Sequence, residues 1–136
     1  MLDIFKKLEY TLRMHQIAFN EISAAEVSAI PTMEQLQLFF AFKVDEEVLR
    51  HPSADSEYGI LERDGRTIYR FRTEKYRIYF TIEDGVVVVQ RVLQADSLQD
   101  FFYRAGVGKG TEDQKLSKSR TFWKLIDAGE QAKRSN

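Results

Sequence analysis

The chain has 136 residues, and its 20 basic and 21 acidic residues give a net charge of −1; this length fits one domain of about 100–200 residues. The absence of cysteine excludes disulfides, thiolate catalysis and cysteine-based zinc sites, and two histidines cannot form a metal site by themselves, so we expect neither a metal nor another cofactor. No run approaches the roughly 18 apolar residues of a membrane span, which predicts a cytoplasmic protein without a membrane partner.

No repeat or linker-like composition divides the sequence, so we predict a single α+β domain. Its parts are a helical extension (1–30), a core (31–104) and a C-terminal loop and helix (105–136). In the extension, Leu2, Phe5, Leu8 and Leu12 have the spacing of one face of an amphipathic helix. The following segment, 16–19, fits either the end of that helix or a short edge strand, and we favour the helix.

A second helix is predicted for 33–51. Pro31 breaks the chain before it, and Thr32 and Glu34 are typical of a helix start. The residues that then lie on or near one stripe are Leu36, Phe39, Phe40, Lys43, Val44 and Val48. The composition of 51–59 indicates a loop after this helix.

Three strands are predicted for 67–72, 76–82 and 86–92, where β-branched and aromatic residues recur with a period of two. A three-residue loop, 83–85, would place Phe80 opposite Val88, with Ile78, Phe80 and Val88 buried. A two-residue turn at 84–85 would instead bring Arg91 beside Ile78 on the apolar face. We reject that register because a buried, unpaired charge is costly.

Two further helices are predicted near the C-terminus. One begins at Asp96 or Ser97 and ends at Gly106 or Gly108, and the other spans 120–128. The expected fold is therefore α+β, with N-terminal helices packed on one face of a curved antiparallel sheet of three to four strands. The C-terminal helix should lie beside that sheet.

Five positive charges fall within twelve residues of the first two predicted strands: Arg66, Arg70, Arg72, Lys75 and Arg77. The hairpin should place Arg72 beside Arg77 and Arg70 beside Tyr79 on one exposed face, joined by Arg91. Like charges placed opposite one another destabilise a strand pair, which favours an anionic ligand such as RNA. An Arg-rich face kept for solubility, or neutralised by Glu62, Asp64 or the acidic N-terminal region, fits the pattern equally well.

The stretch 69–104 resembles the C-terminal half of RelE/ParE toxins. The likeness lies in a basic strand, the sequence Tyr76-Arg77-Ile78, the acidic hairpin 83–85, the valine strand 86–89 and a short helix. The helix at 33–51 stands where that family has a helical hairpin. The resemblance implies a RelE/ParE-like core and a metal-independent endoribonuclease, in which basic residues stabilise the charge formed as the ribose 2′-OH attacks its own phosphate.

That likeness carries the catalytic role onto Arg70, Arg72 and Arg77. The wider RNA-binding set comprises Arg66, Arg70, Arg72, Arg77, Tyr79, Arg91, Tyr103 and Arg104. The arginine that the family has after its third strand is absent near Ala95, and Phe101 stands near the position of a family tyrosine or histidine.

Three functions follow. The first is a RelE/ParE-like RNA-binding protein that acts on RNA or translation, with RNA, the ribosome or an antitoxin as partner. The second is a noncatalytic protein-binding or regulatory module that meets an acidic protein. The sequence pI near 6.1 and the missing family arginine near Ala95 favour this module. The third is a gyrase-directed ParE-like toxin.

Overall fold

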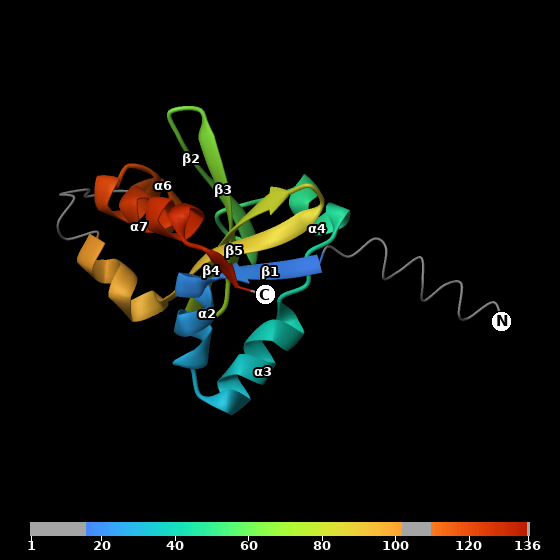
Figure 1. Ribbon diagram of the computed structural model, residues 1–136. Coiled ribbons are helices and arrows are strands. Elements are labelled where there is room, and N and C mark those ends of the chain that lie inside the picture. Colours follow the sequence, from blue (N-terminus) through green and yellow to red (C-terminus); the bar gives the residue numbers. More distant parts are fainter. Residues whose placement is uncertain (1–15, 102–109, 136) are drawn as a thin grey trace, which may run out of the picture.

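The computed structural model describes residues 16–101 and 110–135, in which a six-stranded sheet has helices over both faces (Figure 1). The predicted α+β class is confirmed: N-terminal helices accompany a mostly antiparallel sheet and a C-terminal helix. The sheet has more strands than predicted. The C-terminal helices cover its second face instead of lying beside it. Within the two ranges, no helix is long and apolar enough to cross a membrane.

The strand order is β2-β3-β4-β5-β1-β6, and only the β1–β5 pair is parallel. The strands are β1 (Gln16–Asn20), β2 (Tyr58–Arg63), β3 (Arg66–Arg72), β4 (Tyr76–Glu83), β5 (Val86–Gln94) and β6 (Arg134–Ser135). The helices are α2 (Glu21–Ser28), α3 (Thr32–Ala41), α4 (Glu46–Arg50), the 3-10 helix η1 (Ala95–Leu98), α6 (Glu112–Ser117) and α7 (Arg120–Gln131). The predictions of β3, β4, β5 and α7 are confirmed.

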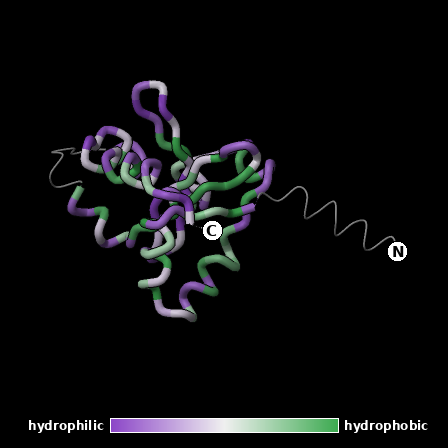
Figure 2. The backbone as a smooth tube through the Cα atoms, in the orientation of Figure 1, coloured by the Kyte–Doolittle hydropathy of each residue, from purple (hydrophilic) through white to green (hydrophobic). Residues whose placement is uncertain are grey.

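Two clusters of apolar side chains lie on opposite faces of the sheet. Phe42, Phe71, Phe80 and Ile78 belong to the cluster beneath the N-terminal helices. Leu61, Tyr79, Leu116, Phe122 and Ile126 belong to the cluster beneath α6 and α7. Figure 2 shows hydrophobic residues along the central strands and hydrophilic residues at the tip of the β2–β3 hairpin. Both faces of β3 and β4 are therefore removed from water.

The segment Gln16–Asn20 is a strand, so the prediction of a helix there is wrong. β1 pairs with the first half of β5, from Gln16 opposite Val86 to Phe19 opposite Val89. Its last residue, Asn20, then caps α2 by accepting a hydrogen bond from the Ser23 amide. Pairing with a strand about seventy residues away decided the conformation of this five-residue segment. The helix predicted from Leu2 to Leu12 lies outside the described residues.

The helix predicted for 33–51 is two helices separated by an extended stretch. Phe42 has extended dihedral angles, and its ring contacts the rings of Tyr58, Phe71 and Phe80. Asp45 then starts α4 by accepting a hydrogen bond from the Val48 amide. The predicted apolar stripe is consequently wrong in part.

Burial shows where that stripe fails. Leu38, Phe42 and Val44 are buried, whereas Leu36 and Phe40 are 63% and 77% exposed. Leu36 and Phe40 lie before the break at Phe42, on the side of α3 that faces away from Leu38 and Phe39, and these two residues pack on the core.

The β4–β5 turn has the two-residue form that the sequence argument rejects. Asp84 and Gly85 both have positive φ (51° and 77°), the geometry of a hairpin turn that suits Asp-Gly. A β-bulge then leaves Gln90 without a strand partner, so Arg91 lies opposite Tyr79 and Val92 lies opposite Ile78. The extra residue removes the burial cost that motivated the three-residue loop. Ile78, Phe80 and Val88 are buried as predicted, but Phe80 pairs with Val89.

The core assignment can be tested with Phe80→Ala. Phe80 is fully buried among aromatic rings, so its truncation should lower the free energy of unfolding by about 3–5 kcal/mol. Thr67→Ala, on an exposed position of β3, is the matched control and should cost no more than about 1 kcal/mol. Urea denaturation measures both changes. A loss below about 1 kcal/mol for Phe80→Ala would contradict this core.

Candidate functional site

The predicted arginine cluster does share one sheet face, but that face is closed. Arg72 lies opposite Arg77 and Arg70 lies opposite Tyr79, as predicted. Arg70 and Tyr79 are fully buried, and Arg77 is 9% exposed. The prediction that these side chains are exposed is wrong, because α6 and α7 pack over them and supply acidic partners.

Arg70 uses every donor that its guanidinium group has. Its Nε and Nη2 donate to the two carboxylate oxygens of Asp113 on α6, both at 2.9 Å. Nη1 donates to the carbonyls of Ser56 and Glu57 at 3.1 Å, and Nη2 donates to that of Ser53 at 3.1 Å. Five contacts therefore match the five N–H groups of an arginine, which leaves none for a phosphate.

The strand pair leaves space for this guanidinium group only because residue 59 is a glycine. Gly59 lies opposite Arg70 in the β2–β3 pair. A Cβ at Gly59 would lie 2.1 Å from Arg70 Nη2 and 2.8 Å from Asp113 Oδ2. Any larger residue would displace the ion pair.

Two more arginines of the predicted RNA-binding set are also held internally. Arg77 pairs with Glu112 of α6, with 2.8 Å between Nε and Oε2, and donates to the carbonyls of Thr73 and Tyr76. Arg91 pairs with Glu26 of α2 at 2.8 Å and donates to the Leu125 carbonyl at 3.2 Å.

The remaining members have different surroundings. Arg66 lies over the Trp123 ring, 5.1 Å from its centroid, and pairs with Asp127 and Glu130 of α7. Arg72 is half-buried, and among the described residues its side chain donates only to the Ser56 carbonyl, at 3.3 Å. Tyr103 and Arg104 lie outside the described residues. Sequence reasoning anticipated Glu26 as part of the acidic N-terminal region but missed the acidic residues of α6 and α7.

One local signal could have located α6. Thr111 and Gln114 form a capping box, in which each side chain bonds the backbone N–H of the other. A threonine followed three residues later by glutamine is a known helix start, and it places Glu112 and Asp113 in the first turn. The arginines that pair with these two carboxylates lie 35 and 43 residues away in sequence. The capping box therefore does not identify them.

Tyr79 is the buried polar group that this packing leaves unsatisfied. Its hydroxyl has no hydrogen-bond partner among the described residues, and its ring meets Phe122 edge to face at 4.8 Å. Burial raises the pKa of the Tyr79 hydroxyl well above its ordinary value of 10. Neither proton transfer at neutral pH nor base stacking is open to this side chain.

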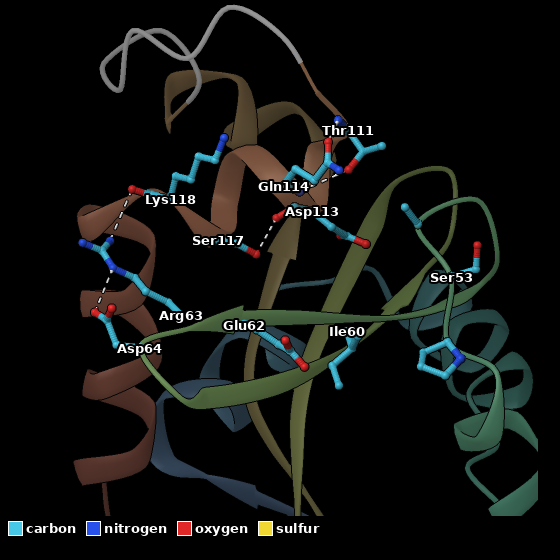
Figure 3. A pocket seen from close by; sticks show the side chains of 12 residues that line it. Ser53, Ile60, Glu62, Arg63, Asp64, Thr111, Asp113, Gln114, Ser117 and Lys118 are labelled. Atoms are coloured by element: carbon cyan, nitrogen blue, oxygen red, sulfur yellow. Dashed lines mark hydrogen bonds and ion pairs between the residues drawn. The ribbon is translucent and has the colours of Figure 1, made fainter.

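A groove of about 630 Å³ remains accessible beside the closed face (Figure 3). Ile60 and Glu62 of β2 form one wall, and Thr111, Gln114 and Ser117 of α6 form another. Ser53 lies at one end, and Arg63 and Lys118 lie at the other. The lining is mostly polar side chains, and Lys118 is exposed.

The backbone of β2 faces this groove with unused hydrogen-bonding groups. Along the strand, backbone groups point alternately toward β3 and away from it. The carbonyl of Tyr58 points away and accepts from the Ser53 amide at 2.9 Å. The next outward positions are Ile60 and Glu62, and their outward N–H and C=O groups have no partner among the described residues.

Comparison with known proteins adds no assignment, because no protein-family model and no curated protein matches the sequence. The candidate site therefore rests on geometry alone. Among residues 16–101 and 110–135, no group of three acidic or histidine side chains is placed to hold a metal ion.

The structural role of the arginine face is tested by Asp113→Ala. This change leaves the Arg70 charge buried without its carboxylate, so it should cost about 3–5 kcal/mol of unfolding free energy. Glu130→Ala removes an exposed partner of Arg66 and should cost no more than about 1 kcal/mol. Chemical denaturation compares the two. Equal, small losses would show that Asp113 does not hold the face closed.

Tyr79→Phe tests the buried hydroxyl through its pH dependence. The pKa of Tyr79 is raised in the folded chain, so its contribution to stability is complete below pH 10 and declines as the pH rises above that value. The variant should match or exceed the wild type at pH 7, because it removes an unpaired hydroxyl. It should also lose less stability above pH 10. Tyr58, whose pKa burial raises to about 12, titrates in both proteins. Parallel alkaline curves would contradict this account.

Proposed function

We propose that this chain is a noncatalytic protein-binding module that takes an extended polypeptide segment along the outer edge of β2. The observation that carries this proposal is the pair of outward backbone positions, Ile60 and Glu62, whose free N–H and C=O groups border the 630 Å³ groove. An exposed strand edge is a ready template for another strand, and many peptide-binding domains use one.

A backbone group of the chain itself already bonds the first outward position of this edge, at Tyr58. The Ser53 amide donates to the Tyr58 carbonyl, as a neighbouring strand would. A bound segment that continues along the same line would meet Ile60 and then Glu62, and each residue offers one donor and one acceptor. The hydroxyl and amide groups of Thr111, Gln114 and Ser117 line the opposite wall and suit a polar polypeptide backbone.

Charge at one end of the groove favours an acidic residue in the partner. Lys118 has no acidic partner among the described residues. Arg63 donates to the Lys118 carbonyl at 3.3 Å, and its only carboxylate contact among them is Asp64, at 3.6 Å. A glutamate or aspartate of the bound segment can pair with both cations. This retains the acidic partner expected from the sequence but places it at the groove instead of on the sheet face.

RelE/ParE-like RNA binding is the second candidate, and a different basic surface supports it. Arg120 and Lys124 are exposed near the start of α7 without an acidic partner among the described residues. With Arg66 and Trp123 they border a cavity of about 280 Å³. RNA cleavage has weaker support, because Arg70 and Arg77 pair with Asp113 and Glu112. No described residue favours a gyrase-directed activity.

The edge is tested with Ile60→Pro. Proline removes one outward N–H, and an edge strand tolerates it where the N–H faces out of the sheet. Ile60→Ala is the matched control, because it removes the side chain and keeps the donor. A phage-displayed library of random peptides should yield extended, acidic ligands for the wild type. Affinity for the selected peptides should fall about three- to tenfold with Ile60→Pro beyond the effect of Ile60→Ala.

Circular dichroism verifies that both variants fold. Equal affinities of Ile60→Pro and Ile60→Ala, or a library that yields no ligand, would contradict peptide binding at β2. A salt-sensitive affinity for RNA that is lost in the double variant Arg120→Glu and Lys124→Glu, without selected peptides, would assign the function to the second surface.

A further inference from the structure

The cavity of about 280 Å³ beside α7 has a positively charged lining. The tip of the β2–β3 hairpin forms one side of it, and α7 forms the other. Its charged side chains are four cations and two carboxylates: Arg63, Arg66, Arg120, Lys124, Asp64 and Asp127. The lining therefore has a formal excess of two positive charges, although the whole chain has a net charge of −1. A local excess of this kind attracts anions.

The two carboxylates of this lining are either already paired or exposed to solvent. Asp127 pairs with Arg66, which also pairs with Glu130 at 2.9 Å, so the charge of Arg66 is neutralised within the fold. The carboxylate of Asp64 lies 3.6 Å from Arg63 Nε, and its side chain is 92% exposed. Water weakens an ion pair of that length and exposure. The two carboxylates consequently leave most of the positive charge of the cavity uncompensated.

Three cations of the lining remain available to a ligand. Arg120 and Lys124 are exposed and have no acidic partner among the described residues. They are four residues apart on α7, where like charges lie side by side and destabilise the helix. Arg63 donates from Nη1 to the Lys118 carbonyl, and its Nη2 group has no partner within residues 16–101 and 110–135. An anion that contacts all three cations would offset the repulsion between them.

We propose that this cavity binds a phosphoryl group, which a phosphoserine or phosphothreonine of the segment in the β2 groove carries. A phosphorylated side chain has a charge of about −1.5 to −2 at pH 7 and three acceptor oxygens. Its charge matches the excess in the lining, and its oxygens match the three available cations. The carrier rests on the protein-binding function proposed above, whereas the anion site does not.

The cavity and the β2 groove share two lining residues, Arg63 and Asp64. Figure 3 shows both at the end of the groove where Lys118 lies. Arg63 directly follows Glu62, the last outward position of the β2 edge. A segment that pairs along β2 and continues past Glu62 therefore comes to Arg63, whose side chain borders both spaces. A phosphorylated residue at that end of the segment is placed to enter the cavity.

The surroundings of the cavity favour an isolated phosphoryl group over a nucleic-acid strand. Asp64, Asp127 and Glu130 lie around the cations, and their charges would repel the next phosphates of a continuous backbone. Trp123 offers no platform for a base, because it is 5% exposed and Arg66 lies over its ring. A single phosphorylated side chain needs neither a continuous basic track nor a stacking surface.

Titration with inorganic phosphate tests the anion site without any peptide. In a nitrogen-15 NMR spectrum of the full chain, the Nε–H resonances of Arg63 and Arg120 should shift and saturate, while that of exposed Arg50 on α4 should not move. The double variant Arg120→Gln and Lys124→Gln should lose the shift at Arg63. The matched control, Lys43→Gln and Arg50→Gln, removes two exposed cations elsewhere and should keep it. Absence of a saturable shift at Arg63 and Arg120 would overturn the site.

Phosphorylated peptides test the carrier. Peptides selected for β2 are synthesised with a serine or a phosphoserine added beyond each end in turn. At one end, phosphoserine should raise the affinity for the wild type and for the matched control about tenfold or more over serine, since charge-assisted hydrogen bonds are the strong ones. In the double variant Arg120→Gln and Lys124→Gln the gain should fall to about twofold or less, while the serine form binds as it does to the wild type.

The possible failures are distinguishable. Selected peptides that bind equally well with serine and with phosphoserine would overturn this inference and leave binding at β2 intact. Phosphate shifts without that gain would show an adventitious ion only. If no peptide binds at β2, the protein-binding function fails and the carrier fails with it, and the phosphate titration then decides the anion site alone. A single-stranded RNA that binds more tightly than the phosphopeptides, and loses affinity in the Arg120→Gln and Lys124→Gln variant, would replace the phosphopeptide with RNA.

Discussion

The buried ion pair between Arg70 and Asp113 is the interaction on which the arrangement of this chain depends. It joins β3 to α6 across 43 residues of sequence, and through the carbonyls of Ser53, Ser56 and Glu57 it also fixes the loop that enters β2. Taking a guanidinium group out of water is costly unless all its donors and its charge are satisfied. The donors and the charge of the Arg70 guanidinium group are all satisfied, so α6 has little freedom to move away from the sheet.

Closure of this face determines which surfaces can meet a ligand. With α6 held by Arg70 and Arg77, Leu116 and Phe122 complete the apolar cluster on that side, and α7 follows. The N-terminal helices cover the other face. Among residues 16–101 and 110–135, the sheet edge at β2, the start of α7 and the exposed side of α3 remain open to a partner. Among these, β2 combines free backbone groups with a defined groove.

Local patterns in the sequence predicted much of the sheet and little of its surroundings. The alternation of Arg70, Arg72 and Arg77 with apolar residues specified β3 and β4 and the pairing of their side chains, because a period of two is a property of neighbouring residues. The bulge at Gln90, the break at Phe42 and strand β1 each depend on distant partners, so no local pattern defines them.

The candidate site, too, depends on contacts between distant residues that no local sequence pattern defines. The sequence showed that several arginines share a face, and it left open whether that face is solvated, neutralised or bound to RNA. Only the positions of Glu112 and Asp113 decide that Arg70 and Arg77 are structural, and those carboxylates lie in a six-residue helix that was not predicted. The β2 groove had no sequence signal, because its polar edge consists of backbone groups that every strand has.

The Nε–H group of Arg70 offers the most direct measurement of the central claim that this guanidinium is sealed against Asp113. In a nitrogen-15 NMR spectrum, the Arg70 Nε–H resonance should exchange with water far more slowly than that of exposed Arg120, since its donor is buried and bonded at 2.9 Å. Its chemical shift should not change when a short RNA is added. Rapid exchange, or a shift of that resonance on adding RNA, would contradict the account and return Arg70 to the role that the sequence first suggested.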